Sequence, residues 1–407
     1  MAYIFIIIAL LVATILSVFC VWLYFVFYLL KSFKQSPTLM FFAGPDTTNE
    51  LPKVSVIIAA RNEEKYISKC LDSLIKQDYP NFEIIAIDDS SSDSTCGIMQ
   101  KYQMKNSDKM VVINAGLSPN EWTGKNWACY QGYLKSTGKI FLFTDADTFC
   151  TSRTLSQAVG NLSREKLDAL TVRPTIVCES RWAKIILPVL WTFSHIKYSA
   201  LRVNDHKTKK CGYFFGCFYL ITRQTYEGVG THREVKNQIL EDLALGEKVK
   251  QQGYKLKMYR GEHQVNTMQV GNFSIVLQGL GRGLNLIPFS RNDSTSFFLT
   301  AFLLAAPIFL LLLSTFLLTQ KDDPYTAINL LSRVLLIISL MTVIIIICVS
   351  VIQSKIGICQ HLAYGLASPM ACLLISIMFG FFIMNQRNNV TASIKWRGRQ
   401  YINHKKR

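Results

Sequence analysis

The chain has 407 residues, 50% of them hydrophobic, and a formal net charge of +17. This length suits two domains, or one soluble domain with a membrane part. No basic segment interleaved with aromatic residues and no zinc-type cysteine spacing is present, which argues against nucleic acid as a partner. Excess Lys and Arg are instead typical of the cytoplasmic side of a membrane protein.

An uncharged segment opens the chain. Residues 2–30 ("AYIFIIIALLVATILSVFCVWLYFVFYLL") exceed the roughly 20 residues that cross a hydrocarbon core. The segment has no basic start and no small-residue cleavage site, so a signal peptide is not expected. We therefore predict a transmembrane helix over residues 1–30, followed by a linker over 31–50.

Three more apolar segments lie later in the chain, at 297–319, 334–352 and about 358–384. They predict a membrane region over 291–384 and hence an integral, multi-pass protein of the cell membrane. The tail over 385–407 has seven basic and no acidic residues, which predicts a cytoplasmic position like that of the soluble part at 51–290. One span before the soluble part and three after it would put the tail outside, so we expect one later segment to be re-entrant or interfacial.

The eleven cysteines are scattered, several of them in apolar segments, and form no paired framework. A reducing compartment is the simpler interpretation. The Asn-x-Ser/Thr matches at Asn161, Asn272, Asn292 and Asn389 are then not expected to carry glycans.

Strands and helices alternate from residue 53 onward. Short apolar, β-branched runs predict strands at 53–60, 82–88, 109–115 and 139–145. Helical patterns follow the first three strands, and Glu63 and Glu64 suit the first turn of the first of these helices. This alternation predicts parallel strands joined by right-handed crossovers, that is, an α/β Rossmann-like domain over residues 51–290.

Acidic residues follow three of these strands: "ARNE" after the first, "DDSSSD" after the second and "TDAD" after the fourth. Turn chemistry explains any one of them. Because ligands of such sheets bind at the carboxyl ends of the strands, three acidic groups at one edge predict a ligand site.

Two carboxylates after the fourth strand suggest a metal ion. On an extended backbone, Asp145 and Asp147 point to the same side about 7 Å apart, and could share a cation if the strand end bends. Oxygen ligands favour Mg²⁺ or Mn²⁺ over zinc. No Walker-type loop is present, so a nucleotide diphosphate held by the metal fits better. Lys125, which opens a helix, could add a positive contact to the diphosphate or could be a solvated surface residue.

The chain resembles the family 2 glycosyltransferases with the GT-A fold over roughly residues 50–285. The resemblance rests on the stretches "VSVIIAARNEEKYISKCLDSL", "FEIIAIDDSSSDST", "GKNWACYQG", "FLFTDADT", "GCFYLITRQTYEGVGTH" and "ILEDLALGEKVKQQGYKLKM". Within the family the chain is most similar to membrane-bound enzymes that glycosylate lipids, such as the ceramide glucosyltransferase, hopanoid-associated and carotenoid glycosyltransferase groups. The resemblance implies a GT-A domain flanked by transmembrane helices.

The resemblance also implies the donor site. Ala60, Arg61 and Glu63 match the loop that contacts the uracil and ribose of a nucleotide sugar. Asp88 or Asp89 matches the acidic group that holds the base or ribose. The expected donor is therefore a nucleotide-diphosphate sugar, with a UDP-sugar preferred.

The catalytic parts follow by the same resemblance. Asp145 and Asp147 match the D-x-D pair that binds the metal ion, with Asp145 also at the donor. Asp242 matches the carboxylate that acts as general base in an inverting, single-displacement transfer of a hexose. From the residues alone, "ED" at a helix start is commonly a favourable interaction with the helix dipole.

One departure concerns the acceptor. Processive polysaccharide synthases carry Q-x-x-R-W, whereas this chain has "LQGLGRGLN", with Gln278 and Arg282 one residue too far apart and Gly283 in place of Trp. This argues against chain elongation and favours a lipid acceptor. A processive polysaccharide synthase and a catalytically silent membrane subunit that binds a partner remain the alternatives.

Two further segments bear on the acceptor. Residues 181–201 carry two Trp residues and suit either a core helix or an interfacial helix on the membrane. His195 within this segment is expected to be structural, and His232 is a weaker site candidate. The basic tail around Trp396 and Arg399 is expected to contact lipid headgroups.

Overall fold

The computed structural model describes residues 2–39, 51–209, 211–269, 291–319, 327–359, 362–387, 393–396 and 399–402. The chain divides into two compact units. The first, here called the helical unit, comprises Met1–Lys31, Cys178–Ile196 and Val270–Arg407. The second, here called the sheet domain, comprises Ser32–Val177 and Lys197–Gln269.

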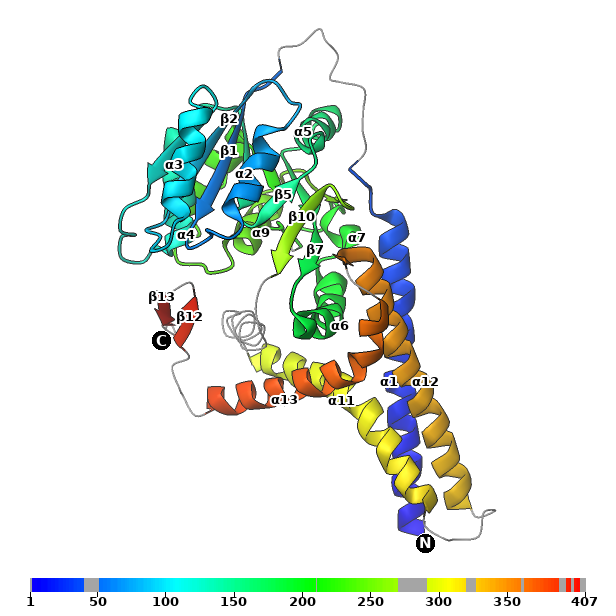
Figure 1. Ribbon diagram of the computed structural model, residues 1–407. Coiled ribbons are helices and arrows are strands. Elements are labelled where there is room, and N and C mark those ends of the chain that lie inside the picture. Colours follow the sequence, from blue (N-terminus) through cyan, green and yellow to red (C-terminus); the bar gives the residue numbers. More distant parts are fainter. Residues whose placement is uncertain are drawn as a thin grey trace. The chain divides into compact units, whose positions relative to one another are not determined.

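The sheet domain alternates strands and helices as the sequence predicts (Figure 1). Its first half contains β1 (Val54–Ala60), α2 (Ile67–Ile75), β2 (Phe82–Asp88), α3 (Thr95–Lys105), β3 (Met110–Asn114), α4 (Gly124–Lys135), β4 (Ile140–Asp145), β5 (Thr148–Cys150) and α5 (Thr154–Arg164). Its second half contains β6 (Ala169–Arg173), β7 (Thr175–Cys178), α7 (Ala200–Val203), β8 (Tyr219–Thr222), α8 (Arg223–Gly228), the 3₁₀ turn η1 (Thr231–Arg233), α9 (Glu241–Gln251), β9 (Leu256–Arg260) and β10 (Val265–Gln269).

Seven strands form the main sheet, in the order β3-β2-β1-β4-β8-β6-β9. The four predicted strands pair in parallel, β1 with β2 and β4, and β2 with β3. Strand β8 is antiparallel to both β4 and β6, and β6 is parallel to β9. The carboxyl ends of every strand except β8 therefore meet at one edge, here called the carboxyl edge.

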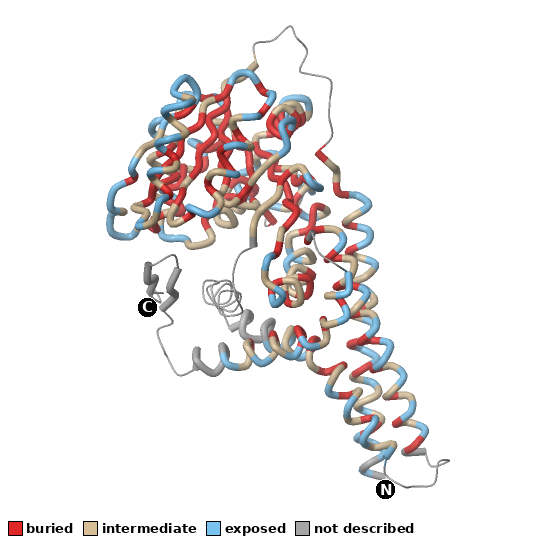
Figure 2. The backbone as a smooth tube through the Cα atoms, in the orientation of Figure 1, coloured by how far each residue is buried: buried red, intermediate tan, exposed pale blue. Residues whose placement is uncertain are grey.

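Both faces of the sheet are buried, which explains the continuous apolar runs of its central strands. Along β1, Val56 and Ile58 pack into a core with Leu71 of α2, whereas Ile57 packs into a core on the other face with Ala128 of α4. Figure 2 shows buried residues concentrated along the strands. Alternate residues of a strand point to opposite faces, so a strand covered on both sides needs apolar side chains throughout.

The predicted start of the first helix is wrong by one turn. Helix α2 begins at Ile67, and Glu63 lies in the preceding turn, where its carbonyl accepts hydrogen bonds from the backbone N–H groups of Tyr66 and Ile67, each at 2.9 Å. Asn62 has a left-handed backbone with φ 53°, which breaks the helical path before Glu63. Glu63 and Glu64 are therefore held in the loop after β1 rather than in the helix.

The helical unit is built from α1 (Ala2–Gln35), α6 (Arg181–Lys197), α11 (Arg291–Thr319), α12 (Ala327–Gly357), the 3₁₀ turn η2 (Leu362–Ala367), α13 (Ser368–Arg387) and the hairpin β12 (Ser393–Trp396) and β13 (Arg399–Ile402). Four segments are long and apolar enough to cross a membrane: Phe5–Gln35, Phe298–Thr319, Asn329–Gly357 and Leu362–Phe381. They overlap the four predicted membrane segments; the first extends further along the chain than predicted, and the third extends beyond the predicted segment at both ends.

The segment with two possible interpretations, 181–201, forms α6 for most of its length. The ring of Phe193 on α6 packs edge-to-face against Trp22 at 6.1 Å and Phe25 at 5.9 Å, both on α1. The indole of Trp22 donates a hydrogen bond to the carbonyl of Leu303 at 3.0 Å. Helix α6 thus packs with the apolar helices and not in the core of the sheet domain, and its position at the membrane surface stays a prediction.

Candidate active site

Three segments that are far apart in the sequence meet around one ammonium group at the carboxyl edge. Lys125 Nζ lies 2.8 Å from Asp145 Oδ1 and 2.6 Å from Glu241 Oε1. Asp145 is the last residue of β4, Lys125 the second of α4 and Glu241 the first of α9. The side chain of Glu241 is only 7% exposed, and its ion pair with the lysine offsets part of the cost of removing this carboxylate from water.

The position of Lys125 follows from the start of its helix. Thr123 caps α4, and its hydroxyl accepts a hydrogen bond from the backbone N–H of Asn126 at 3.3 Å. Burial alone would lower the pKa of Lys125, but Asp145, Glu241 and Asp242 outweigh it and raise that pKa well above its usual value. Lys125 therefore stays charged at any physiological pH.

Asp242 lies next to this cluster and is held by two backbone donors. Its Oδ2 accepts a hydrogen bond from the N–H of Gly216 at 3.0 Å, and its Oδ1 accepts one from the N–H of Leu243 at 2.8 Å. Burial, followed by the charge of Glu241, raises the pKa of Asp242 to about 7, while Lys125 and the Leu243 N–H oppose the rise. A carboxyl group with a pKa near the working pH suits proton transfer.

Asp145 and Asp147 flank a bend. Strand β4 ends at Asp145, Ala146 is buried, and β5 starts at Thr148. Asp147 Oδ1 accepts a hydrogen bond from the hydroxyl of Thr267 at 3.3 Å. Within the described ranges, no group of three or more His, Cys, Asp and Glu side chains is arranged to hold a metal ion. The two carboxylates still offer the oxygen ligands that Mg²⁺ and Mn²⁺ prefer, so their role as a metal pair stays a prediction.

The predicted donor residues lie together at the ends of β1 and β2. Arg61 Nη1 donates hydrogen bonds to the carbonyls of Asp89 and Ser90, the latter at 2.9 Å. The N–H of Asp89 in turn donates to the carbonyl of Ala60 at 2.8 Å. The loops after the two strands are thus fastened to one another.

The carboxylates of this region are buried in the same loops. Asp88 is 3% exposed, and its oxygens accept long hydrogen bonds from the N–H of Ser91 at 3.3 and 3.4 Å. Glu63 is also buried, and its N–H donates to the hydroxyl of Thr95 at 2.7 Å. Ser90 and Asn62 both have a positive φ, 56° and 53°, a strained conformation that is common in ligand-binding loops.

Sequence reasoning missed a buried amide beside Lys125. Asn126 is fully buried, and its Nδ2 donates to the carbonyls of Val235 at 2.6 Å, Gln238 at 2.9 Å and Lys236 at 3.1 Å. The Thr123 N–H adds a bond to the Lys236 carbonyl at 2.8 Å. These bonds tie the start of α4 to the loop that leads into α9. The only signal in the sequence is an amide inside the apolar stretch "NWAC".

His232 is placed by its contacts in a structural role. The imidazole is fully buried, and its Nδ1 lies 2.6 Å from the hydroxyl of Tyr226, which also accepts a hydrogen bond from the His232 N–H at 3.2 Å. Burial, with a contribution from Lys125, lowers the pKa of His232 to about 3. The ring therefore stays neutral and contributes to packing.

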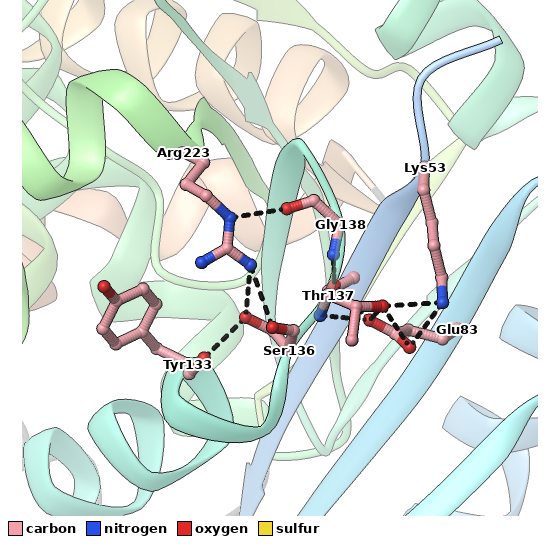
Figure 3. A network of polar contacts seen from close by, with 8 residues as sticks. Lys53, Glu83, Tyr133, Ser136, Thr137, Gly138 and Arg223 are labelled. Carbon is pink, nitrogen blue, oxygen red and sulfur yellow. Dashed lines mark hydrogen bonds and ion pairs between the residues drawn. The ribbon is translucent and has the colours of Figure 1, made fainter. Parts of the chain in front are cut away.

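A second polar network lies at the opposite, amino edge of the sheet (Figure 3). Glu83 accepts hydrogen bonds from Thr137 and pairs with Lys53 at 2.8 Å, and Arg223 donates to the carbonyls of Gly138 and Ser136, each at 2.9 Å. Burial would raise the pKa of Glu83, but bonds from Lys53, Ser55 and Thr137 lower it to about 2. This network joins β2, the end of α4 and α8, and serves stability.

Some predicted positions lie outside the described residues, namely Gln278, Arg282, Gly283 and Arg397. Trp396 and Arg399 face one another in the register of the β12–β13 hairpin. Nothing in the described residues tests the predicted contact of the tail with lipid headgroups.

Comparisons with known proteins point to glycosyltransferases. Residues 55–228 match Glycosyl transferase family 2. The chain is 30% identical over 216 residues to a 4,4'-diaponeurosporenoate glycosyltransferase of Staphylococcus aureus (strain MRSA252), covering 51% of this chain and 54% of the relative. The same protein from strain USA300 is 29% identical over the same length. The chain thus spans about half the length of the curated relatives it matches.

The solved structures found by comparison share less sequence identity with this chain. The mannosyltransferase PcManGT from Pyrobaculum calidifontis, in complex with GDP-Man and Mn²⁺, has a TM-score of 0.46 and 16% identity, over 95% of this chain and 98% of that one. S. aureus TarS has a TM-score of 0.39 and 19% identity, over 67% of this chain and 46% of that one. Residues 55–228 are therefore similar to Glycosyl transferase family 2, and they lie in an α/β sheet with the strand order β3-β2-β1-β4-β8-β6-β9.

Proposed function

We propose that this protein is an inverting glycosyltransferase that moves a hexose from a nucleotide-diphosphate sugar to a lipid acceptor at the cytoplasmic face of the membrane. The observation that supports this most directly is the position of Asp242, with a pKa of about 7, beside the Lys125–Asp145–Glu241 cluster at the carboxyl edge of a family 2 domain. Ligands of such sheets bind at this edge.

The donor would lie across the ends of β1, β2 and β4. The nucleoside is proposed to bind at the ends of β1 and β2, which are surrounded by Ala60, Arg61, Glu63, Asp88 and Asp89. The expected nucleotide part of the donor is UDP. Asp145 and Asp147 are proposed to hold Mg²⁺ or Mn²⁺, which when bound would neutralise charge on the diphosphate as it leaves. Lys125 would add a fixed positive charge at the same place.

The transfer needs one base. Asp242 accepts the proton of an acceptor hydroxyl while that oxygen forms a bond to the anomeric carbon and the bond from this carbon to the diphosphate oxygen breaks. Attack from the face opposite the leaving group inverts the configuration. Glu241 holds Lys125 through its ion pair, and its charge contributes to the raised pKa of Asp242.

The lipid acceptor is supported by the apolar helices and by the relatives. Four segments are long and apolar enough to span a membrane, and the curated relatives are glycosyltransferases named for 4,4'-diaponeurosporenoate. We assign the catalytic part to residues 51–290, with membrane segments over 1–30 and 291–384, a linker over 31–50 and a cytoplasmic tail over 385–407. A processive synthase would instead release long glycan products.

The test uses the full chain in membranes with a total lipid extract and a panel of radiolabelled UDP- and GDP-sugars. Label should appear in a single glycolipid in the organic phase, be lost with Asp242→Asn, and be kept with Asp108→Asn, which removes an exposed carboxylate of the same size. Label that stays water-soluble, or products that grow in length, would contradict single transfer to a lipid.

A further inference from the structure

Two arginines end neighbouring strands at the carboxyl edge. Strands β6 and β9 pair in parallel with Arg173 opposite Arg260 in the register. The guanidinium of Arg173 lies 5.4 Å from the ring centre of Phe33, and that of Arg260 lies 4.8 Å from the same ring. Arg173 is 9% exposed. The structure thus gathers two positive charges around one aromatic ring, with at least one of them almost fully buried.

Burial and the neighbouring charge of Arg260 both disfavour the charged form of Arg173. Burial and then the charge of Arg260 lower the pKa of Arg173 to about 10, while Glu262 opposes the shift. Glu262 is 47% exposed and pairs with Arg260 Nη1 at 2.9 Å. The buried Nε of Arg260 has no hydrogen-bond partner within the part of the chain that the structure describes. Contact with an aromatic ring attracts cations but does not cancel their mutual repulsion, so an anion placed on the pair would be strongly favoured.

The pair lies on the catalytic side of the sheet. Tyr213 is partly buried, and its pKa is raised by burial and then by Asp242, while Arg173 acts in the opposite direction. The same tyrosine is therefore within electrostatic range of the proposed base and of Arg173. An acceptor whose hydroxyl reaches Asp242 would thus lie at the same edge of the sheet as these guanidinium groups.

The chain that leaves the first apolar helix covers the pair. Phe33 belongs to the membrane-span candidate Phe5–Gln35. Just beyond the helix, the N–H of Arg260 donates to the carbonyl of Pro37 at 2.8 Å, and the N–H of Leu39 donates to the carbonyl of Arg260 at 3.0 Å. An apolar ring and the end of a membrane-span candidate thus adjoin the charged pair, which suits a ligand with both a charged group and an apolar chain.

We propose that Arg173 and Arg260 bind the anionic headgroup, carboxylate or phosphate, of the lipid acceptor. The proposal rests on the function proposed above and narrows its acceptor class to anionic amphiphiles. Guanidinium groups suit this task because their planar N–H donors match the oxygens of both anions, and Arg remains charged even when it is largely buried.

Binding of simple amphiphiles tests this in the full chain, placed in phosphatidylcholine nanodiscs without donor sugar. The probes are radiolabelled dodecyl phosphate, dodecanoate and the neutral dodecanol, and empty nanodiscs give the background partitioning. We expect the wild-type chain to bind at least one of the anionic probes above background and not to bind dodecanol. Arg173→Gln and Arg260→Gln should each weaken that binding by about 10- to 100-fold, as expected for loss of a charge-assisted hydrogen bond.

Two further variants separate this effect from misfolding or a loss of net charge. Arg164→Gln removes a charge on an exposed side chain and should leave binding unchanged. Glu262→Gln removes the carboxylate that competes for Arg260, and should strengthen binding of the anionic probe, a gain that a damaged fold would not produce. Equal binding of dodecanol and dodecyl phosphate, or unchanged binding after both arginines are replaced, would show a purely structural cluster and overturn the proposal.

Inorganic phosphate identifies the source of the anion. It should displace dodecyl phosphate only at concentrations far above those of the lipid probe, because it lacks the apolar chain. Displacement at equal concentrations would refute an amphiphile site. Failure of sugar transfer would count against the proposed function, whereas failure of probe binding counts against this site, because the two are measured separately.

Discussion

The pKa of Asp242 links activity to stability, and Asp242→Asn separates the two. A general base is needed only in transfer, so the variant should transfer sugar about two to four orders of magnitude more slowly while nucleotide binding stays near wild type. The wild-type rate should rise with pH through about 7, where Asp242 loses its proton, and this rise should be absent from the residual activity of the variant.

The stability effect has a definite sign. The pKa of Asp242 is raised from 3.8 to about 7, so its favourable contribution is complete below about 3.8 and is lost as the pH rises through about 7. The full difference of roughly three units amounts to about 4 kcal/mol at 1.36 kcal/mol per unit. The range from pH 5 to the pKa of about 7 covers about two pH units of this difference. Screening at a partly exposed carboxyl reduces the expected loss of stability between pH 5 and pH 8 to about 1–2 kcal/mol.

The measurement is the apparent melting temperature of the full chain in detergent at pH 5 and pH 8. Asparagine does not titrate, so the melting temperature of the variant, relative to that of the wild type, should rise by about 2–8 °C from pH 5 to pH 8. At a fixed pH the variant also loses a hydrogen bond, because its amide nitrogen must face one of the N–H donors of Gly216 and Leu243. That cost does not depend on pH. An unchanged difference between variant and wild type at the two pH values would refute the raised pKa.

Four further outcomes follow from the same geometry. Lys125→Met should lower transfer at least about 100-fold. It should also shift the rise of the pH–rate profile to a pH above 7, since the ammonium lowers the pKa of the base, and an unshifted rise would contradict this. Gly216→Ala places a Cβ 2.8 Å from the carboxylate of that base, and should slow transfer about tenfold with UDP affinity unchanged in calorimetry. Asn126→Ala removes three hydrogen bonds and should destabilise the protein by about 2–4 kcal/mol in thermal unfolding, against about 0.5 kcal/mol for the exposed bond lost in Asn81→Ala. Verified removal of metal with EDTA, or Asp147→Ala, should abolish donor hydrolysis and transfer alike in a radiolabel assay; full turnover in EDTA would contradict the metal pair.

The carboxyl edge could be predicted because its strands carry a local signal. Runs such as "VSVIIAA" and "IFLFTD" are apolar throughout, as strands buried on both faces must be, and the polar residues that follow them mark where the strands end. Parallel pairing then brings Asp88 and Asp145 to one edge without any knowledge of the strand order. The pairing of Glu241 with Lys125 could not be predicted from such local patterns, because it depends on how the chain brings the start of α9 to that edge.

Contacts that depend on strand order had no such signal. Arg173 and Arg260 become neighbours because β8 runs antiparallel between β4 and β6, and β9 then adds in parallel to β6. Nothing in the local pattern of these short strands fixes that order. Asn126 was missed for a related reason, since its three carbonyl partners come from a loop that follows β8 by many residues.

Two adjacent acidic residues at the start of α9 contact different groups, because a helix points successive side chains in different directions. Successive helical residues point about 100° away from one another, so Glu241 reaches Lys125 while Asp242 reaches the N–H of Gly216. The glutamate keeps the lysine in place, and its charge helps to raise the pKa of the aspartate toward the pH at which a base is useful. A single carboxylate could not do both, because direct pairing with the ammonium would stabilise its charged form and weaken it as a base. Under the proposed mechanism, the "ED" pair at this helix start has a catalytic role in addition to its interaction with the helix dipole.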